Sequence, residues 1–87
     1  MPTVFFPAQL RPLTGGRESV DVDGKSVRQV VEQLERLYPG ISERLVNDGR
    51  LRPNISVAVD GVVSPLGLLE ETPPDSEIHF VTAISGG

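Results

Sequence analysis

The sequence ends in two glycines, Gly86 and Gly87, which follow Ile84-Ser85 directly after a predicted strand. Glycine has no Cβ and adopts almost any backbone conformation, so a glycine tail fits a slot that is too narrow for a side chain. The group that such a tail delivers is its main-chain carboxylate. We therefore expect the carboxylate of Gly87 to be the reactive group, with Gly86, Ser85 and Ile84 threading it into a partner's site.

No set of side chains competes with this terminus as a catalytic centre. The chain has no Cys, which excludes a thiol nucleophile, a thiolate zinc site and a disulfide framework. Its one histidine, His79, alternates with Ile78 and Phe80 and is expected on the opposite face of a strand, in an ordinary surface role. A lone histidine makes no catalytic triad. We predict no catalytic side chain and no metal site.

Two further pairs of residues are interpreted as structural. The side chains of Glu70 and Glu71 are adjacent in the sequence, so they project apart, and a solvated loop is favoured over a catalytic carboxylate pair. Gly15-Gly16 lacks the lysine and the strand-to-helix setting of a phosphate-binding loop. We therefore predict a turn there.

Composition limits the function classes further. A chain of 87 residues forms one domain with a small core. Twelve acidic residues against eight basic ones give a formal charge of −4, and the basic residues are scattered from Arg11 to Arg52, which argues against nucleic acid as a partner. Apolar runs are only a few residues long, and the N-terminus Met1-Pro2-Thr3 has no basic region leading into an apolar segment. We expect a soluble, cytoplasmic protein without a membrane partner.

The first twenty-two residues predict a β-hairpin. Val4 to Leu10 is rich in strand-forming residues, residues 12–16 supply turn residues, and alternation resumes over Ser19–Val22. Pro7 lies inside the first predicted strand, where it removes a hydrogen-bond donor and indicates a bulge or an unpaired edge.

The clearest helix signal follows this hairpin. Ser26 and Gln29 fit a capping box, and the helix is expected to stop near Tyr38 because Pro39 and Gly40 follow. Apolar residues recur at helical spacing along it: Val27, Val30, Val31, Leu34 and Leu37.

The second half predicts more strands. Ile41–Leu45 is expected to add a helical turn, and residues 47–50 and 53–54 to form an exposed loop. Alternation over Ile55–Val59, followed by the turn signal Asp60-Gly61, predicts a second hairpin that returns through Val62-Val63. The last strand is expected over residues 77–83.

These elements give the order ββαβββ, or ββαββ with a short extra turn. We predict an α+β fold with a mixed sheet packed on one main helix, as a single domain over residues 1–87 with a flexible tail at 84–87. The helix face is expected to cover Ile55, Val57, Ile78 and Phe80.

A domain of this order that ends in Gly-Gly resembles the β-grasp, ubiquitin-like sulfur carriers of the MoaD/ThiS type. The resemblance covers the whole chain, and Val4-Phe5-Phe6-Pro7-Ala8-Gln9-Leu10-Arg11 is similar to the first strand of the molybdopterin-type carriers. Pro7 departs from that branch, which often has an aromatic residue near this point. Thr14-Gly15-Gly16, with Leu10-Arg11-Pro12, and Gly40-Ile41-Ser42-Glu43-Arg44-Leu45 are more similar to the actinobacterial carriers of the CysO type.

The resemblance implies a chemistry and its partners. In this family an E1-like enzyme of the MoeB/ThiF type uses ATP to adenylate the terminal carboxylate, which here would be that of Gly87. The adenylate becomes a thiocarboxylate, whose sulfur passes to a biosynthetic enzyme. That enzyme would be a cysteine synthase, the large subunit of molybdopterin synthase, or a thiazole or thiosugar synthase. The carrier itself would need no catalytic side chain and no bound cofactor.

Docking is expected on the sheet face beside the tail. Val81 and Ala83 are the candidates there, and Leu66 is a candidate to extend the surface. Two other functions stay open. The chain could be a ubiquitin-like conjugator that forms an isopeptide bond through Gly87, although Lys25 is its only lysine. It could also be a non-covalent interaction module in which Gly86-Gly87 has no role.

Overall fold

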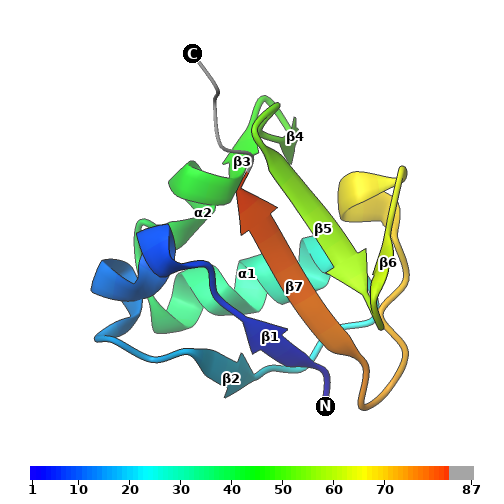
Figure 1. Cartoon of the computed structure of the whole chain (residues 1–87), viewed down its shortest axis with the longest axis horizontal. Coiled ribbons are helices and arrows are strands. Elements are labelled where there is room, and N and C mark those ends of the chain that lie inside the picture. Colours follow the sequence, from blue (N-terminus) through cyan, green and yellow to red (C-terminus); the bar gives the residue numbers. More distant parts are fainter. Residues whose placement is uncertain (83–87) are drawn as a thin grey trace.

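The first strand lies inside the main sheet, next to the strand at its centre (Figure 1). The computed structural model describes residues 1–82. Strand β1 (Thr3–Phe5) pairs antiparallel with β2 (Ser19–Asp21) and parallel with the last strand, β7 (Glu77–Thr82). The predicted opening hairpin is therefore confirmed, and the parallel pair makes the sheet mixed.

The connection between β1 and β2 differs from the prediction. The expected strand as far as Leu10 is wrong, because Ala8–Thr14 forms a 3-10 helix, η1. Pro7 lies outside β1 and caps η1 in an extended conformation, so it makes no bulge. Leu10 is buried and Leu13 is partly buried against the same core; their spacing of three residues is one turn of a 3-10 helix. The predicted turn at Gly15-Gly16 is confirmed, and both glycines have positive φ angles, 67° and 86°.

Helix α1 (Val27–Leu37) begins and ends as predicted. The Ser26 Oγ accepts a hydrogen bond from the Gln29 backbone N–H at 3.3 Å. The returning bond differs from a capping box: Gln29 Oε1 accepts from the Lys25 N–H at 2.9 Å, one residue before the N-cap. Both bonds satisfy backbone donors at the start of the helix.

One apolar residue of α1 does not join the core. Val27, Val30, Val31 and Leu34 are buried as predicted, but Leu37 is 53% exposed. Leu37 is the last helical residue, and Tyr38 takes the place expected for it. The Tyr38 ring packs edge-to-face on Phe6, with 5.8 Å between ring centroids.

A second hairpin replaces the loop predicted after the helices. The predicted turn at Ile41–Leu45 is confirmed as α2. The next residues pair as β3 (Val46–Asn47) and β4 (Arg50–Leu51). The expected loop at residues 47–50 is therefore a tight hairpin, whose central residues Asp48 and Gly49 both have positive φ angles, 54° and 75°, as a type I′ turn requires.

The remaining strands complete the main sheet in the order β2-β1-β7-β5-β6. β5 (Ile55–Val59) pairs antiparallel with β7 on one side and with the short β6 (Val62–Val63) on the other, through the predicted Asp60-Gly61 turn. A second 3-10 helix, η2 (Gly67–Leu69), connects β6 to β7. The chain order of the main sheet and α1 is the predicted ββαβββ. The predicted last strand is described as far as Thr82, and Ala83 lies outside the described residues.

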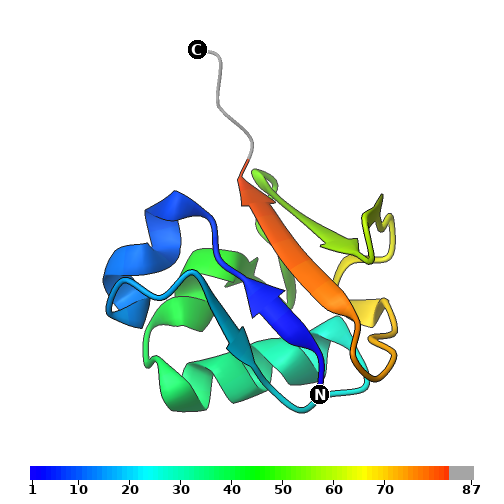
Figure 2. The same ribbon diagram turned by 60° about the horizontal axis from the view of Figure 1, so that its bottom comes forward.

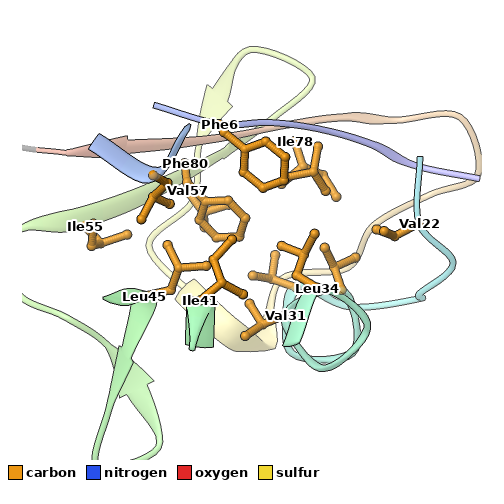
Figure 3. Packing of buried hydrophobic residues seen from close by; sticks show 14 residues of the cluster. Phe6, Val22, Val31, Leu34, Ile41, Leu45, Ile55, Val57, Ile78 and Phe80 are labelled. Atoms are coloured by element: carbon orange, nitrogen blue, oxygen red, sulfur yellow. The ribbon is translucent and has the colours of Figure 1, made fainter. Parts of the chain in front are cut away.

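The sheet and α1 form two layers around one core (Figure 2). The four predicted sheet residues, Ile55, Val57, Ile78 and Phe80, are all buried. Figure 3 shows Phe80 and Val57 pointing from the sheet toward Ile41 and Leu45. α2 therefore covers the end of the sheet core that α1 does not reach.

The Glu35 side chain on α1 forms hydrogen bonds with the start of α2. Its carboxylate accepts hydrogen bonds from the Gly40 N–H, at 3.0 and 3.1 Å to its two oxygens, and from the Ser42 N–H at 2.9 Å. These backbone donors lower the pKa of the Glu35 carboxyl from its ordinary value, the bond from Gly40 having the largest effect. The ionised carboxylate thus satisfies donors at the turn into α2.

We expect Glu35→Gln to destabilise the fold at neutral pH. The carboxyl pKa is lower in the folded chain than in the unfolded one, so its contribution is fully present above the unfolded pKa and is lost as the pH falls through the folded pKa. The difference in free energy of unfolding between wild type and variant should therefore shrink on acidification, which urea unfolding at several pH values measures. Glu32→Gln, an exposed substitution on the same helix, is the control. A difference that is constant with pH would contradict this role for Glu35.

Gly24 lies directly against α1. A Cβ at this position would be 2.8 Å from the Val30 Cγ2 and 3.0 Å from the Val30 backbone N. The Val30 backbone is held in α1 and cannot move away from the added Cβ without shifting the helix. We therefore expect Gly24→Ala to lower the free energy of unfolding by about 1–3 kcal/mol. A double-mutant cycle with Val30→Ala, followed by urea unfolding, should show coupling of at least about 0.5 kcal/mol. Additive effects would show that the close approach is not the cause.

Candidate functional site

The candidate site begins at the C-terminal end of β7. Its last described residue, Thr82, is opposite Ile55, the first residue of β5, so β7 brings the chain to the end of the sheet (Figure 1). The predicted site residues of the tail lie outside the described residues: Ala83, Ile84, Ser85, Gly86 and Gly87. The structure therefore describes the end of β7 and the sheet around it, but not the tail itself.

A row of side chains crosses the sheet face away from α1. The strand registers place Phe5 opposite His79, His79 opposite Ala58, and Ala58 opposite Val63. Val81 lies on the same face, opposite Ser56 and two residues beyond His79. We call Phe5, His79, Ala58, Val63 and Val81 the outer face. It is a mainly apolar strip that reaches the end of the sheet where β7 ends.

His79 lies at the middle of the outer face. Its ring stacks on Phe5 with 4.4 Å between centroids and 3° between planes. Its Nε2 is 3.6 Å from the Glu77 Oε1. The predicted position of His79, on the face opposite Ile78 and Phe80, is confirmed, since both of those residues are buried. The stack fixes the orientation of both rings on the surface.

The two described docking candidates lie in different places. Val81 is 49% exposed and lies on β7 immediately before the end of the described chain. Leu66 is 55% exposed but directly precedes η2, and β5 separates it from β7 in the sheet order. The structure places Val81 one residue before the end of the described chain, whereas Leu66 belongs to another surface at the far edge of the sheet.

Sequence reasoning missed three members of the outer face. Phe5, Ala58 and Val63 were assigned to strands, but their shared face depends on register. The alternation of Phe5 between the buried Val4 and Phe6 was a usable signal. The alignment of Ala58 with both His79 and Val63 was not, because only the observed pairing of β5 with two neighbours defines it.

Acidic residues gather at the opposite end of the sheet. Asp21 lies opposite Thr3, which lies opposite Glu77, the first residue of β7. The Glu77 N–H donates to the Asp60 Oδ1 at 2.9 Å, and the N-terminal ammonium is 3.3 Å from the Asp75 Oδ1. The last strand therefore starts among carboxylates and ends away from them, which limits charge repulsion of an anionic group carried beyond Thr82.

The described part of the chain offers no other centre. Among residues 1–82, no group of three metal-binding side chains is close enough to hold an ion. None of the helices described is long and apolar enough to cross a membrane. Glu71 is exposed, and Glu70 is partly buried and uses its backbone carbonyl to accept a hydrogen bond from the Val27 N–H at 2.9 Å.

Known proteins match this chain over almost its whole length. The model of the ThiS family matches residues 4–87. The sulfur carrier protein CysO of Mycobacterium tuberculosis is 37% identical over 90 residues, which are 98% of this chain and 97% of that protein. One chain of the crystal structure of the Amycolatopsis orientalis BexX/CysO complex matches with a TM-score of 0.94 and 31% identity, covering 100% of both chains. The crystal structure of SAMP1 from Haloferax volcanii matches with a TM-score of 0.76 and 29% identity, covering 99% and 98%.

A mixed sheet covered by one main helix, with its last strand at the centre, defines a ubiquitin-like β-grasp protein. The predicted fold class is confirmed. The chain belongs to the ThiS family. It is a sulfur carrier protein rather than an enzyme, as the matching relatives are.

Proposed function

We propose that this sulfur carrier is loaded at the carboxylate of Gly87. One carboxylate oxygen attacks the α-phosphorus of ATP, which gives an acyl-adenylate and pyrophosphate. Sulfide attacks the acyl carbon and AMP leaves. Alternatively, the terminal sulfur of a persulfide on the enzyme attacks, AMP leaves, and a thiol then reduces the resulting acyl disulfide. The product is a thiocarboxylate, whose sulfur attacks an electrophilic carbon of the acceptor; hydrolysis of the resulting acyl bond regenerates the carboxylate.

The observation that carries the proposal is that the family match extends through Gly87. Chain geometry supports it. The five residues after Thr82 span at most about 17 Å, so the activating site must come this close to the end of β7. A Gly-Gly end presents little steric hindrance to attack at the acyl carbon. All chemistry after docking can therefore take place on the partner.

We infer that the activating enzyme docks on the outer face beside the tail. Val81 is the described candidate nearest to the end of β7, and the apolar row behind it offers area for contact. Ala83 is proposed as a further contact. ATP is bound by the activating enzyme of the MoeB/ThiF type, and the carrier binds no cofactor. Both partners would be cytoplasmic.

The relatives favour one acceptor class over the others. Matching carriers bear the name CysO, so a cysteine-forming synthase is the first acceptor to test, before molybdopterin, thiazole or thiosugar synthases. This choice rests on the name of the relatives alone.

Exchange of labelled pyrophosphate into ATP tests the adenylation step. The full chain, with a purified activating enzyme of the MoeB/ThiF type, should support exchange. A variant lacking Gly86 and Gly87 should not support it, although circular dichroism should show an unchanged fold. Exchange that proceeds equally with the shortened chain would exclude Gly87 as the adenylated residue.

Protein conjugation is the second candidate, because the chain also matches the small archaeal modifier protein SAMP1. Both functions begin with the same adenylate, and they differ in whether sulfur or a lysine amine attacks it. Incubation with ATP, the activating enzyme and a cell extract distinguishes them. Isopeptide-linked adducts that resist thiol and hydroxylamine would support conjugation, and their absence with thiocarboxylate present supports sulfur transfer alone.

A further inference from the structure

A groove lies along the edge of the sheet that is far from β1 and β2. It has a volume of about 590 Å³ and lies between β4, the edge of β5 and the segment around η2. Figure 1 shows β4 and η2 on the same side of β5, the side away from β7. The groove is separate from the outer face, whose members Phe5, His79 and Val81 do not line it.

The charge of this groove is opposite to that of the chain. Arg28, Arg50 and Arg52 line it, whereas none of its lining residues is acidic, in a chain with a formal charge of −4. Asp48 and Glu70 flank it in the sequence without lining it. Within residues 1–82 no ion pair engages the three arginines, and Arg52 makes one described bond, from its Nε to the Glu43 carbonyl at 2.7 Å. Their charges are therefore available to an anionic ligand.

The walls of the groove are apolar and partly open to solvent. Leu66 is 55% and Leu69 is 74% exposed, and both line it together with the buried Ile55 and Val57. Large exposed leucines beside arginines do not suit a small hydrophilic anion. They suit a ligand that presents carboxylates and apolar side chains along one extended length.

The edge of β5 beside the groove lacks a complete partner strand. β6 pairs with β5 only at Ala58 and Val59, and one more bond follows, from the Ser64 N–H to the Val57 carbonyl at 2.9 Å. No further strand of the described chain pairs with β5 on this side, but the Ile55 N–H is already used by a hydrogen bond to the Arg52 carbonyl at 2.8 Å. Few main-chain groups therefore remain for an extended peptide beside β5, so its side-chain contacts must supply most of the binding.

We propose that this groove binds an extended, acidic segment of a partner protein whose apolar side chains alternate with its carboxylates. The segment lies along the edge of β5, its carboxylates meet Arg28 and Arg50, and its apolar side chains contact Leu66 and Leu69. The groove begins beside Ile55, which is opposite Thr82, so a partner held there lies next to the end of β7. This docking does not depend on the chemistry at Gly87.

Binding of a synthetic peptide to the full-length chain tests the proposal. The probe is a seven-residue peptide that alternates Glu with Val or Leu, and the comparison peptide has Lys in place of each Glu. We expect only the acidic peptide to bind by fluorescence anisotropy, and its binding to weaken with added salt. In NMR spectra, amide shifts should concentrate at residues 55–57 and 66–69.

Charge-reversing variants make the test specific. Arg28→Glu together with Arg50→Glu should weaken binding by about tenfold or more, and Leu69→Asp should also weaken it. Arg36→Glu, an exposed charge reversal on α1 outside the groove, should leave binding unchanged. Equal binding of both peptides, shifts confined to β2 or the outer face, or no binding would overturn the proposal. The same shifts produced by inorganic tripolyphosphate would also overturn it, in favour of a simple anion site.

Discussion

Removal of Gly86 and Gly87 is expected to abolish thiocarboxylate formation while leaving the fold intact. The reacting carboxylate would then end on Ser85, too short by two residues to reach the acyl-transfer site and shielded by a Cβ. The core lies entirely within the residues before the tail, so the free energy of unfolding should change by no more than about 0.5 kcal/mol. Intact mass after loading and urea unfolding measure the two effects.

Single substitutions in the tail serve as matched controls. Gly86→Ala adds a Cβ where close passage is expected and should slow loading strongly. Ser85→Ala keeps the Cβ and the length of the tail, and should be loaded at nearly the wild-type rate. Normal loading of the chain without Gly86-Gly87, or a large loss of stability on their removal, would contradict the proposed role of the tail.

Val81→Asp is expected to weaken recognition by the activating enzyme at least about tenfold in kcat/KM, because a charge would be desolvated at the proposed contact. Val81 is 49% exposed, so the same substitution should change the free energy of unfolding little. Steady-state loading rates at several carrier concentrations give the effect, which should appear mainly in KM.

The control for Val81 is another exposed valine. Val62 is 70% exposed on β6 and pairs with Val59, so it lies outside the outer face as well as outside the groove. Val62→Asp should leave kcat/KM nearly unchanged. Equal losses for the two variants would indicate a general effect of added negative charge and would remove the evidence for docking on the outer face.

The helix and its core partners could be predicted because their signals are local. Val27, Val30 and Leu34 repeat at the helical period, and Val57 and Ile78 alternate at the strand period, so each buried face is defined within one element. The same reasoning failed over residues 8–14, where an alternation of Phe6, Ala8 and Leu10 concealed a 3-10 helix. The spacing of Leu10 and Leu13 was the competing signal, and packing against the core decided between them.

Two Asp-Gly pairs in the sequence mark tight turns, but only one of them was predicted to form a hairpin. Asp60-Gly61 and Asp48-Gly49 are the same dipeptide, and all four residues have positive φ angles. The first was interpreted as a hairpin because the five-residue alternating stretch Ile55–Val59 precedes it. The second was not, because its strands contain only two residues each, too few to show an alternating pattern.

The candidate site also has a part that the local sequence predicts and a part that only the fold brings together. The tail could be identified from Gly86-Gly87 alone, because its chemistry is that of the main chain. The outer face and the arginine-lined groove could not, because each gathers residues from three or more separated segments. Arg28 and Arg50 look like scattered surface charges until α1 and β4 bring them to one groove.

Intact-protein mass spectrometry tests the central claim most directly. The full-length chain is incubated with ATP, a sulfide source and a purified activating enzyme of the MoeB/ThiF type, and fragments containing the last residues are then sequenced. The account predicts a mass gain equal to the replacement of one oxygen by one sulfur, located on Gly87 and absent without ATP. A chain that is adenylated but never gains sulfur, or that gains it at any other residue, would contradict the account.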